Sequence, residues 1–368
     1  MTDESAASGT PAPDAQTDGR RRDREIAEAN LGRAADAPPQ VGAHGKVGPH
    51  SGRLPMRVGT RGSPLARVQT DLFLASLRVV CPALGFAPEA FAPEIISTTG
   101  DRVQDRRLAE IGGKGLFSKE IHEALRDGRI DFAVHSLKDL ETDLPPGIIL
   151  ACTMKREDSR DALILPAPPP TDAERDPWRL LPARARVGTS SLRRQAQLLH
   201  ARPDIEITLL RGNVRTRMEA VRTGQHDATF LALAGLRRLD VDLAPVLPID
   251  PEAMVPSAGQ GIVGITVREE DTKLAELLAA IEDPEAKAVS TAERALLAAL
   301  DGSCRTPIGG HARLLPDGAL HLTGLTATPD GSFLLKRSIT GTAADAARLG
   351  RELGTSLRRD SPAAIFED

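Results

Sequence analysis

Aromatic residues are scarce in this sequence: together they make up 2% of its 368 residues, and tyrosine is absent. Proteins that bind single-stranded nucleic acid stack its bases on aromatic side chains, so this composition argues against such a function. The formal net charge of -4 argues in the same way against a general polyanion-binding protein. We therefore predict no nucleic-acid partner.

Cysteine is also sparse, with only Cys81, Cys152 and Cys304 in the chain. Three scattered thiols form no disulfide framework, and neither a C-x-x-C pair nor paired histidines suggest a metal site. The sequence also lacks an apolar run long enough to cross a bilayer and the basic-then-apolar order of a secretory signal. We expect a monomer in a reducing, cytoplasmic setting, with no metal and no membrane partner.

The composition along the chain divides it into four parts. The first 52 residues contain no aromatic and few aliphatic residues, so they cannot bury enough apolar surface to offset their ordering entropy. From Met56 onward, short apolar runs alternate with helical patterns, which is typical of an α/β protein. The predicted parts are a disordered tail (1–52), one α/β lobe (53–155 and 256–282), a second α/β lobe (156–255) and a small C-terminal α+β domain (283–368).

Two pairs of similar segments indicate that the lobes are related. Residues 57–60 (RVGT) recur at 186–189, and residues 123–131 resemble residues 219–227 in the same order. In each copy the second segment leads into an apolar strand, which is predicted to end in a charged pair. We therefore predict two periplasmic-binding-protein-like lobes with a ligand-binding cleft between them.

Local signals predict several elements and their ends. Ser63 and Pro64 are typical of a helix start, and that helix is predicted to run to about Leu77. A helix over 286–300 and a last helix from about Ala343 enclose short strands with turns at 316–318 and 329–331. These signals support the α+β character of the C-terminal domain.

Arginine is concentrated in the second lobe. From Arg186 to Arg238, both included, there are ten arginines, no lysine and four acidic residues. A guanidinium binds a carboxylate or phosphate through two parallel hydrogen bonds, and helix N-termini attract the same anions. Part of the excess reflects a general preference of this chain for arginine, and the rest predicts a multivalent carboxylate or phosphate ligand.

The charged pairs at the predicted strand ends differ between the lobes: Lys138 and Asp139 in one, Arg237 and Arg238 in the other. Asp139 is therefore expected to be a lone carboxylate in a cationic cleft, where it would stabilise a cation formed during a reaction. The alternative is that Lys138 and Asp139 form an ordinary ion pair on the protein surface. The glycine-rich stretch at 98–119 does not satisfy the P-loop pattern and is expected to be a mobile loop over the cleft, or an ordinary connection.

Cys304 lies in a glycine- and proline-containing loop after a predicted helix, next to Arg305. A neighbouring cation lowers the pKa of a thiol, and the thiolate is the nucleophile. Cys81 and Cys152 lie in apolar surroundings and are expected to be inert. From these features alone, an exposed loop cysteine without function is the favoured interpretation of Cys304.

Seven ordered segments together resemble the hydroxymethylbilane synthases, also called porphobilinogen deaminases. Six of them are residues 57–66 (RVGTRGSPLA), 112–117 (GGKGLF), 134–139 (VHSLKD), 188–195 (GTSSLRRQ), 210–217 (LRGNVRTR) and 256–261 (PSAGQG), and the seventh is the Cys304 loop. The resemblance covers about residues 55–368. It implies a dipyrromethane cofactor held by a thioether to Cys304, and Asp139 as the catalytic carboxylate that stabilises positive charge as porphobilinogen loses ammonia. Four such units would be joined before hydrolysis releases hydroxymethylbilane.

The resemblance also implies a set of binding residues. The cofactor-binding residues would be Lys138, Thr189, Ser190, Ser191, Arg193, Arg194, Arg211, Arg217, Arg238 and Gln260. The substrate-binding residues would be Arg61, Ser63, Arg211 and Arg217. Two positions depart from the family: Glu141 stands where proline is frequent, and Arg215 stands where a small or neutral residue is common.

Two other classes of protein remain as alternatives. A noncatalytic bilobal anion-binding protein, such as a component of an importer, predicts a secretion signal and needs no third domain with a loop cysteine. A regulatory ligand-binding module predicts a helix-turn-helix at one end of the chain. The sequence favours the enzyme over both.

Overall fold

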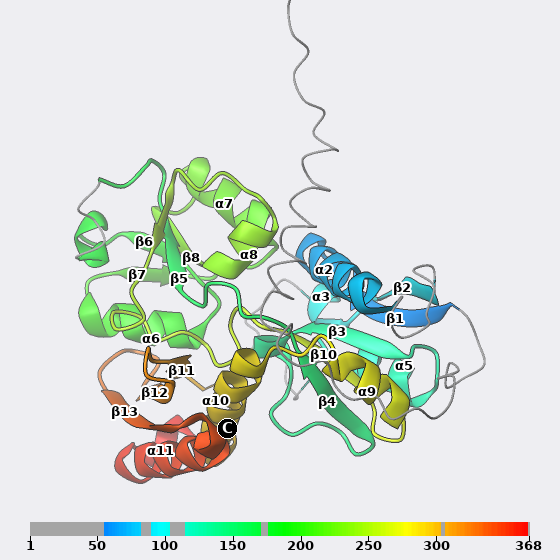
Figure 1. The fold of residues 1–368 in the computed structure, drawn as a ribbon. Coiled ribbons are helices and arrows are strands. Elements are labelled where there is room, and N and C mark those ends of the chain that lie inside the picture. Colours follow the sequence, from blue (N-terminus) through cyan, green and yellow to red (C-terminus); the bar gives the residue numbers. More distant parts are fainter. Residues whose placement is uncertain (1–54, 82–89, 104–114, 171–175, 303–305, 367–368) are drawn as a thin grey trace, which may run out of the picture.

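The computed structural model describes residues 55–81, 90–103, 115–170, 176–302 and 306–366, and the predicted N-terminal tail lies outside them. Two α/β lobes lie next to each other, with a smaller unit of one sheet and two helices packed below the second lobe (Figure 1). The predicted fold class is confirmed. Within the described ranges, no helix is both long enough and apolar enough to cross a membrane.

The first lobe is built on a five-stranded sheet with the order β2-β1-β3-β10-β4. Its strands are β1 (Met56–Arg61), β2 (Phe91–Ile96), β3 (Phe132–Ser136), β4 (Ile148–Thr153) and β10 (Val263–Arg268). Strands β2 and β3 run parallel to β1, whereas β10 is antiparallel to both of its neighbours. The lobe therefore takes its fourth strand from a distant part of the chain.

Helices cover both faces of this sheet. They are α2 (Pro64–Val80), α3 (Thr99–Arg102), α5 (Lys119–Arg126) and α9 (Thr272–Ala279). Side chains alternate between the faces of β3: Phe132 packs in the core with α2 and α9, and Ala133 packs in the core under α5. The start of α2 is as predicted, because Ser63 Oγ accepts a hydrogen bond from Ala66 N, and the helix ends three residues beyond the predicted Leu77.

The second lobe repeats this topology with the order β7-β6-β8-β5-β9. Its strands are β5 (Asp161–Ile164), β6 (Arg186–Gly188), β7 (Glu206–Thr208), β8 (Ala228–Ala232) and β9 (Val246–Pro248). Its helices are α6 (Leu192–Ala201), α7 (Val214–Arg222), α8 (Leu233–Arg238) and the 3-10 turn η6 (Pro177–Leu180). The strand directions match those of the first lobe pair by pair, so the predicted relation between the lobes is confirmed.

The predicted correspondence of the two charged pairs is wrong. Val58 pairs with Phe132 in one sheet and Val187 pairs with Ala228 in the other, which makes Phe132 and Ala228 equivalent. Counting forward, Lys138 and Asp139 correspond to residues 234 and 235, which are alanine and glycine. Arg237 and Arg238 instead form the last turn of α8, because the chain enters a helix as soon as β8 ends.

The C-terminal unit is a three-stranded antiparallel sheet covered by two helices. It contains α10 (Pro284–Leu300), β11 (Ile308–Leu314), β12 (Ala319–Ala327), β13 (Leu334–Thr342) and α11 (Ala346–Asp360), with short 3-10 turns at Ala343–Asp345 and Ala363–Ile365. The two predicted turns are confirmed, since Gly318 and Gly331 have φ angles of +82° and +75°. The strands of each sheet fall within the predicted domain ranges, and the boundaries themselves stay a prediction.

One buried carboxylate joins the three units. The chain passes between the lobes twice, through residues 154–160 and 249–262. Glu293 of α10 is fully buried and accepts hydrogen bonds from Arg156 Nη1, Gly259 N and Ala312 N, each at 2.7 Å. Arg156 lies in the first connection, Gly259 in the second and Ala312 in β11. A single side chain thus fastens both connections to the C-terminal unit.

Candidate functional site

Asp139 lies where the first lobe faces the second. It ends the 3-10 turn η4 (Leu137–Asp139), which directly follows β3, and Leu137 anchors this turn in the core shared with α10. The Asp139 side chain is one-third exposed, at 33%, and its Oδ2 lies 3.9 Å from Arg61 Nη1. This carboxylate is therefore accessible to a ligand and has a cation beside it.

Arg61, at the end of β1, is fixed from two further sides. Its Nε donates to Asp101 Oδ2 at 3.1 Å, and its guanidinium lies 4.1 Å from the centre of the Phe117 ring. Burial raises the pKa of Asp101, but hydrogen bonds from Arg61 and Thr98 outweigh that effect and leave it lowered. The expectation that Asp139 is a lone carboxylate is wrong, because a second acid shares its arginine.

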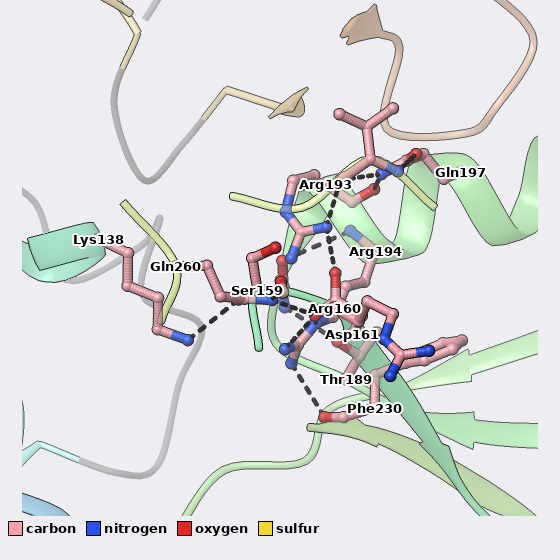
Figure 2. Close-up of polar contacts among 12 residues, drawn as sticks. Lys138, Ser159, Arg160, Asp161, Thr189, Arg193, Arg194, Gln197, Phe230 and Gln260 are labelled. Atoms are coloured by element: carbon pink, nitrogen blue, oxygen red, sulfur yellow. Dashed lines mark hydrogen bonds and ion pairs between the residues drawn. The ribbon is translucent and has the colours of Figure 1, made fainter. Parts of the chain in front are cut away.

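A buried ion-pair cluster lies in the second lobe, as Figure 2 shows. Asp161 at the start of β5 accepts from Arg193 Nη1 at 2.6 Å and from Arg194 Nη2 at 2.6 Å. Arg193 also donates to Val255 O, and Arg194 donates to Phe230 O. Both arginines are only 6% exposed. Their role as cofactor ligands stays a prediction, and in this structure they also hold α6 to β5 and β8.

Gln260 connects this cluster to Lys138 of the first lobe (Figure 2). Its Nε2 donates to Ser159 O at 2.8 Å and to Asp161 Oδ1 at 3.2 Å, and its Oε1 accepts from Lys138 Nζ at 3.3 Å. Burial lowers the pKa of Lys138 to about 8, although the nearby Asp139 acts in the opposite direction. The lysine is therefore a cation near neutral pH that titrates within an accessible range.

Three half-buried cations have backbone or amide partners but no ion-paired carboxylate among the described residues. Arg217 Nε donates to Gly212 O at 3.0 Å, and Arg238 Nη2 donates to Gly261 O at 2.7 Å. Burial lowers the pKa of each to about 10. Neither of them, nor Lys138, forms an ion pair with any carboxylate in the described part of the chain. Half-buried positive charge without an ion-paired carboxylate in the described ranges fits a ligand that carries several carboxylates.

The hydroxyl groups of the site lie at helix starts. Ser191 Oγ caps α6 by accepting from Arg194 N, and Thr189 Oγ1 accepts from Ser191 N at 3.1 Å. Ser190 is half-buried between them, and Ser63 is the cap of α2 in the other lobe. A hydroxyl that accepts one hydrogen bond can still donate its own hydrogen to a ligand.

The lobes contact each other at two places near these residues. Arg211 Nη2, before α7, donates to Gly100 O of α3 at 3.3 Å. Helix α8 packs against the start of α2, where a Cβ atom on Gly235 would lie 3.4 Å from Leu65 Cδ2. Arg211 and Arg61 thus reach the junction from opposite lobes.

Some of the predicted residues cannot be placed. Cys304 and residues 104–114 of the glycine-rich stretch lie outside the described residues. Of that stretch, the structure describes α3 and the turn that precedes α5. The other two thiols are buried as predicted, and burial raises the pKa of Cys81 to about 11 and also raises that of Cys152.

Besides Asp101, sequence reasoning missed two further carboxylates at the site. Asp161 directly precedes an apolar run (ALIL), and an acidic residue at such a place predicts the solvent-exposed end of a strand. Glu141 appeared only as a departure from the family, whereas its carboxylate accepts a hydrogen bond from Ser118 Oγ at 2.6 Å. In both cases the partner lies more than 20 residues away in the sequence, so no local pattern marks the contact.

Two family models match the chain. Residues 56–276 match "Porphobilinogen deaminase, dipyromethane cofactor binding domain", and residues 287–359 match "Porphobilinogen deaminase, C-terminal domain". A curated porphobilinogen deaminase of Paracoccus denitrificans is 46% identical, over 85% of this chain and 96% of its own length. One of Caulobacter sp. (strain K31) is 49% identical, over 85% of this chain and 98% of its own length.

Solved structures with a similar fold are far more distant. The periplasmic VFT2 domain of Bordetella pertussis BvgS is 14% identical, covering 61% of this chain and 86% of that one, with a TM-score of 0.35. A putative periplasmic sulfonate-binding protein of Methylobacillus flagellatus is 16% identical, covering 64% and 67%, with a TM-score of 0.33. These likenesses say nothing about activity.

Proposed function

The chain belongs to the porphobilinogen deaminase family, and from this premise we propose how its own residues carry out the reaction. The family's activity is that of a transferase, hydroxymethylbilane synthase, in porphyrin and haem biosynthesis. Four porphobilinogen molecules are joined with loss of ammonia, and hydrolysis then releases the linear product. Membership at this identity and coverage does not favour a noncatalytic anion-binding protein.

Asp139 is the catalytic carboxylate in this proposal. Its partly exposed oxygens accept hydrogen bonds from the pyrrole N–H of porphobilinogen and stabilise the positive charge that develops as ammonia leaves. Arg61 lies close enough to orient Asp139 and, with Ser63, to bind a substrate carboxylate. Because Asp101 already neutralises much of the Arg61 charge, that arginine can sit beside a developing cation at low electrostatic cost.

The dipyrromethane cofactor matches the charges of the described site. Lys138, Arg217 and Arg238 are half-buried cations without an ion-paired carboxylate among the described residues, and the cofactor carries acetate and propionate groups. We propose that these three, with Arg211 and Gln260, hold those groups, and that Cys304 forms the thioether. When bound, the cofactor supplies the pyrrole carbon to which the first substrate is joined.

The arginine pair of α6 has a more indirect part. Arg193 and Arg194 already donate to Asp161 and to backbone carbonyls. Their nearby positive charge favours a carboxylate ligand, while Asp161 fixes where that charge lies. The hydroxyls of Thr189, Ser190 and Ser191 are placed to add hydrogen bonds at the start of α6.

The observation that carries this proposal is an accessible carboxylate, Asp139, among half-buried cations that have no ion-paired carboxylate in the described part of the chain. Purified protein should consume porphobilinogen with release of one ammonia per molecule, give a colour with Ehrlich's reagent, and carry the extra mass of a dipyrromethane. In Cys304→Ala the extra mass should be lost, and Cys81→Ala is the matched control that should keep it. An adduct on Cys304→Ala, or none on the parent protein, would contradict the attachment site.

We further propose that the protein is a cytoplasmic monomer that binds neither nucleic acid nor membrane. The scarcity of aromatic side chains and the net charge of -4 argue against a nucleic-acid partner, and the scarcity of cysteine fits a reducing compartment. Sedimentation of the pure protein at micromolar concentration should give a single species of about 39 kDa, near the chain mass of 39.1 kDa. A species of twice that mass would overturn the monomer.

A further inference from the structure

Glu141 stands two residues after Asp139, where the family often has proline, and its contacts suggest a role of its own. The carboxylate reaches the turn of residues 115–118, which precedes α5. Glu141 Oε2 accepts the hydrogen bond from Ser118 Oγ at 2.6 Å. A Cβ atom on Gly115 would lie 2.2 Å from Glu141 Oε1, so the other oxygen packs directly on the Gly115 backbone. Gly115 also has a φ of +85°, which favours glycine.

The backbone of Glu141 is fixed from the opposite side. Arg294 of α10 donates through Nη2 to Glu141 O and to Thr142 O, both at 2.8 Å. Arg294 is largely buried, and burial lowers its pKa, with Glu141 and Asp143 acting in the opposite direction. The Glu141 side chain therefore extends from a rigid backbone, and its hydrogen bond to Ser118 restrains the turn rather than Glu141 itself.

The turn carries Phe117, which shapes the site directly. The Phe117 ring lies against the Arg61 guanidinium at 4.1 Å. It also fills the space beside Gly100, where a Cβ atom would lie 2.2 Å from the ring, and Gly100 N donates to Leu116 O at 2.8 Å. The ring is thus held between α3 and Arg61, and its position depends on the turn.

We propose that Glu141 is a positioning residue for the reaction. It holds the turn of residues 115–118 through Ser118 and Gly115, so that Phe117 keeps Arg61 in the orientation that faces Asp139. The inference rests on the proposed roles of Asp139 and Arg61. A proline at this position would make the segment rigid. In this chain Glu141 instead restrains the turn, through its contacts with Ser118 and Gly115.

The test is a set of variants assayed for kcat/KM with porphobilinogen. Glu141→Ala should lower kcat/KM about tenfold, because a small displacement of positioned groups is costly to the rate. Ser118→Ala should give a similar loss, and the double variant should lose no more than either alone. Glu141→Gln should keep more than half of the activity, since its amide oxygen still accepts from Ser118 Oγ. Asp143→Asn, an exposed acid on the same segment, is the matched control and should equal the parent protein.

A merely structural role is separated by two further measurements. The Tm of Ser118→Ala should fall by no more than about 5 °C, as expected for the loss of one hydrogen bond in a chain of this size. In an Arg61→Ala background, Glu141→Ala should change kcat/KM less than twofold, since the group it positions is gone. If Glu141→Ala does not fold, the comparison of Ser118→Ala in the two backgrounds decides the matter.

Several outcomes would overturn the proposal. They are a loss below twofold for both single variants, losses that multiply in the double variant, or an undiminished loss in the Arg61→Ala background. Asp139→Asn, measured alongside, separates this failure from that of the proposed function. If Asp139→Asn is inactive while Glu141→Ala is normal, only the positioning role is wrong. If Asp139→Asn is active, the catalytic assignment itself is wrong.

Discussion

The two lobes share a strand order yet carry their charge at different equivalent positions. After the third strand of the topology, the first lobe has Lys138 and Asp139, whereas the second has Ala234 and Gly235. At the start of the helix after the first strand the difference is reversed. Counted from the capping serines, the second lobe has Arg193 and Arg194, and the first has leucine and alanine at 65 and 66.

The strand that neighbours these positions follows the same rule. Asp161 pairs with Ala232 in the second lobe, and the equivalent pair in the first is Val263 with Ser136. The first lobe is thus charged after its third strand and apolar at the start of the helix that follows its first strand, and the second lobe has the opposite arrangement. The small and apolar members, Gly235 and Leu65, are the ones that approach each other where α8 packs on α2. The two lobes therefore share a topology but contribute different charged residues to the site.

The largest expected effect comes from removing the acid that only the first lobe has. Asp139→Asn should lower kcat by about a thousandfold, because its oxygens lose the charge that stabilises the forming cation. Intact-protein mass should show that the cofactor is still attached. Gly235→Ala, at the equivalent position of the second lobe, should keep kcat within about twofold, since its Cβ would meet Leu65 only at an ordinary contact distance. Wild-type-like turnover of Asp139→Asn would show that the carboxylate found only in the first lobe is not needed for the reaction.

The second effect concerns the acid that only the second lobe has. Asp161→Asn should lower the free energy of unfolding by about 3 kcal/mol, because it leaves Arg193 and Arg194 buried without their counter-ion. Urea unfolding measures this change. Asp204→Asn is the control, since its pair with Arg202 is exposed and should contribute little. Equal stability of Asp161→Asn and the parent protein would show that the cluster is not a stabilising one.

The smallest effect is a pH dependence at Lys138, whose equivalent in the second lobe is an alanine that cannot titrate. Burial lowers the pKa of Lys138 to about 8, so its charge is present below that pH and is lost above it. KM for porphobilinogen should therefore rise about fivefold between pH 7 and pH 9.5, as one charge-assisted hydrogen bond is lost. Lys138→Arg stays protonated over this range and should show no such rise. A parallel rise in both proteins would assign the titration to another group.

Much of the architecture could be predicted from the sequence because its signals are local. The cap at Ser63, the turns at Gly318 and Gly331 and the alternation of strands and helices depend on neighbouring residues. The family motifs gave the order of the site residues along the chain. The error at Arg237 and Arg238 arose because the apolar run after Ala228 has no break to mark where β8 ends and α8 begins.

The chemistry between distant residues could not be predicted in this way. Asp161 lies 32 residues before Arg193 in the sequence, and they meet because β5 pairs with β8 and α6 packs against both strands. The Ser118–Glu141 hydrogen bond likewise joins two turns on either side of β3. Composition suggested an arginine-rich ligand site, whereas the pairing of strands determines which arginines already have a buried counter-ion.

Glu293 has a consequence for how force would pass through the molecule. Both connections between the lobes are bonded to this one carboxylate, and so is the first strand of the C-terminal sheet. Both connections are thus fixed to the C-terminal unit at Glu293. If the lobes move relative to each other, the backbone must bend at residues of the two connections that lie away from this carboxylate. Loss of this one carboxylate would weaken the attachment of both connections to the C-terminal unit at once.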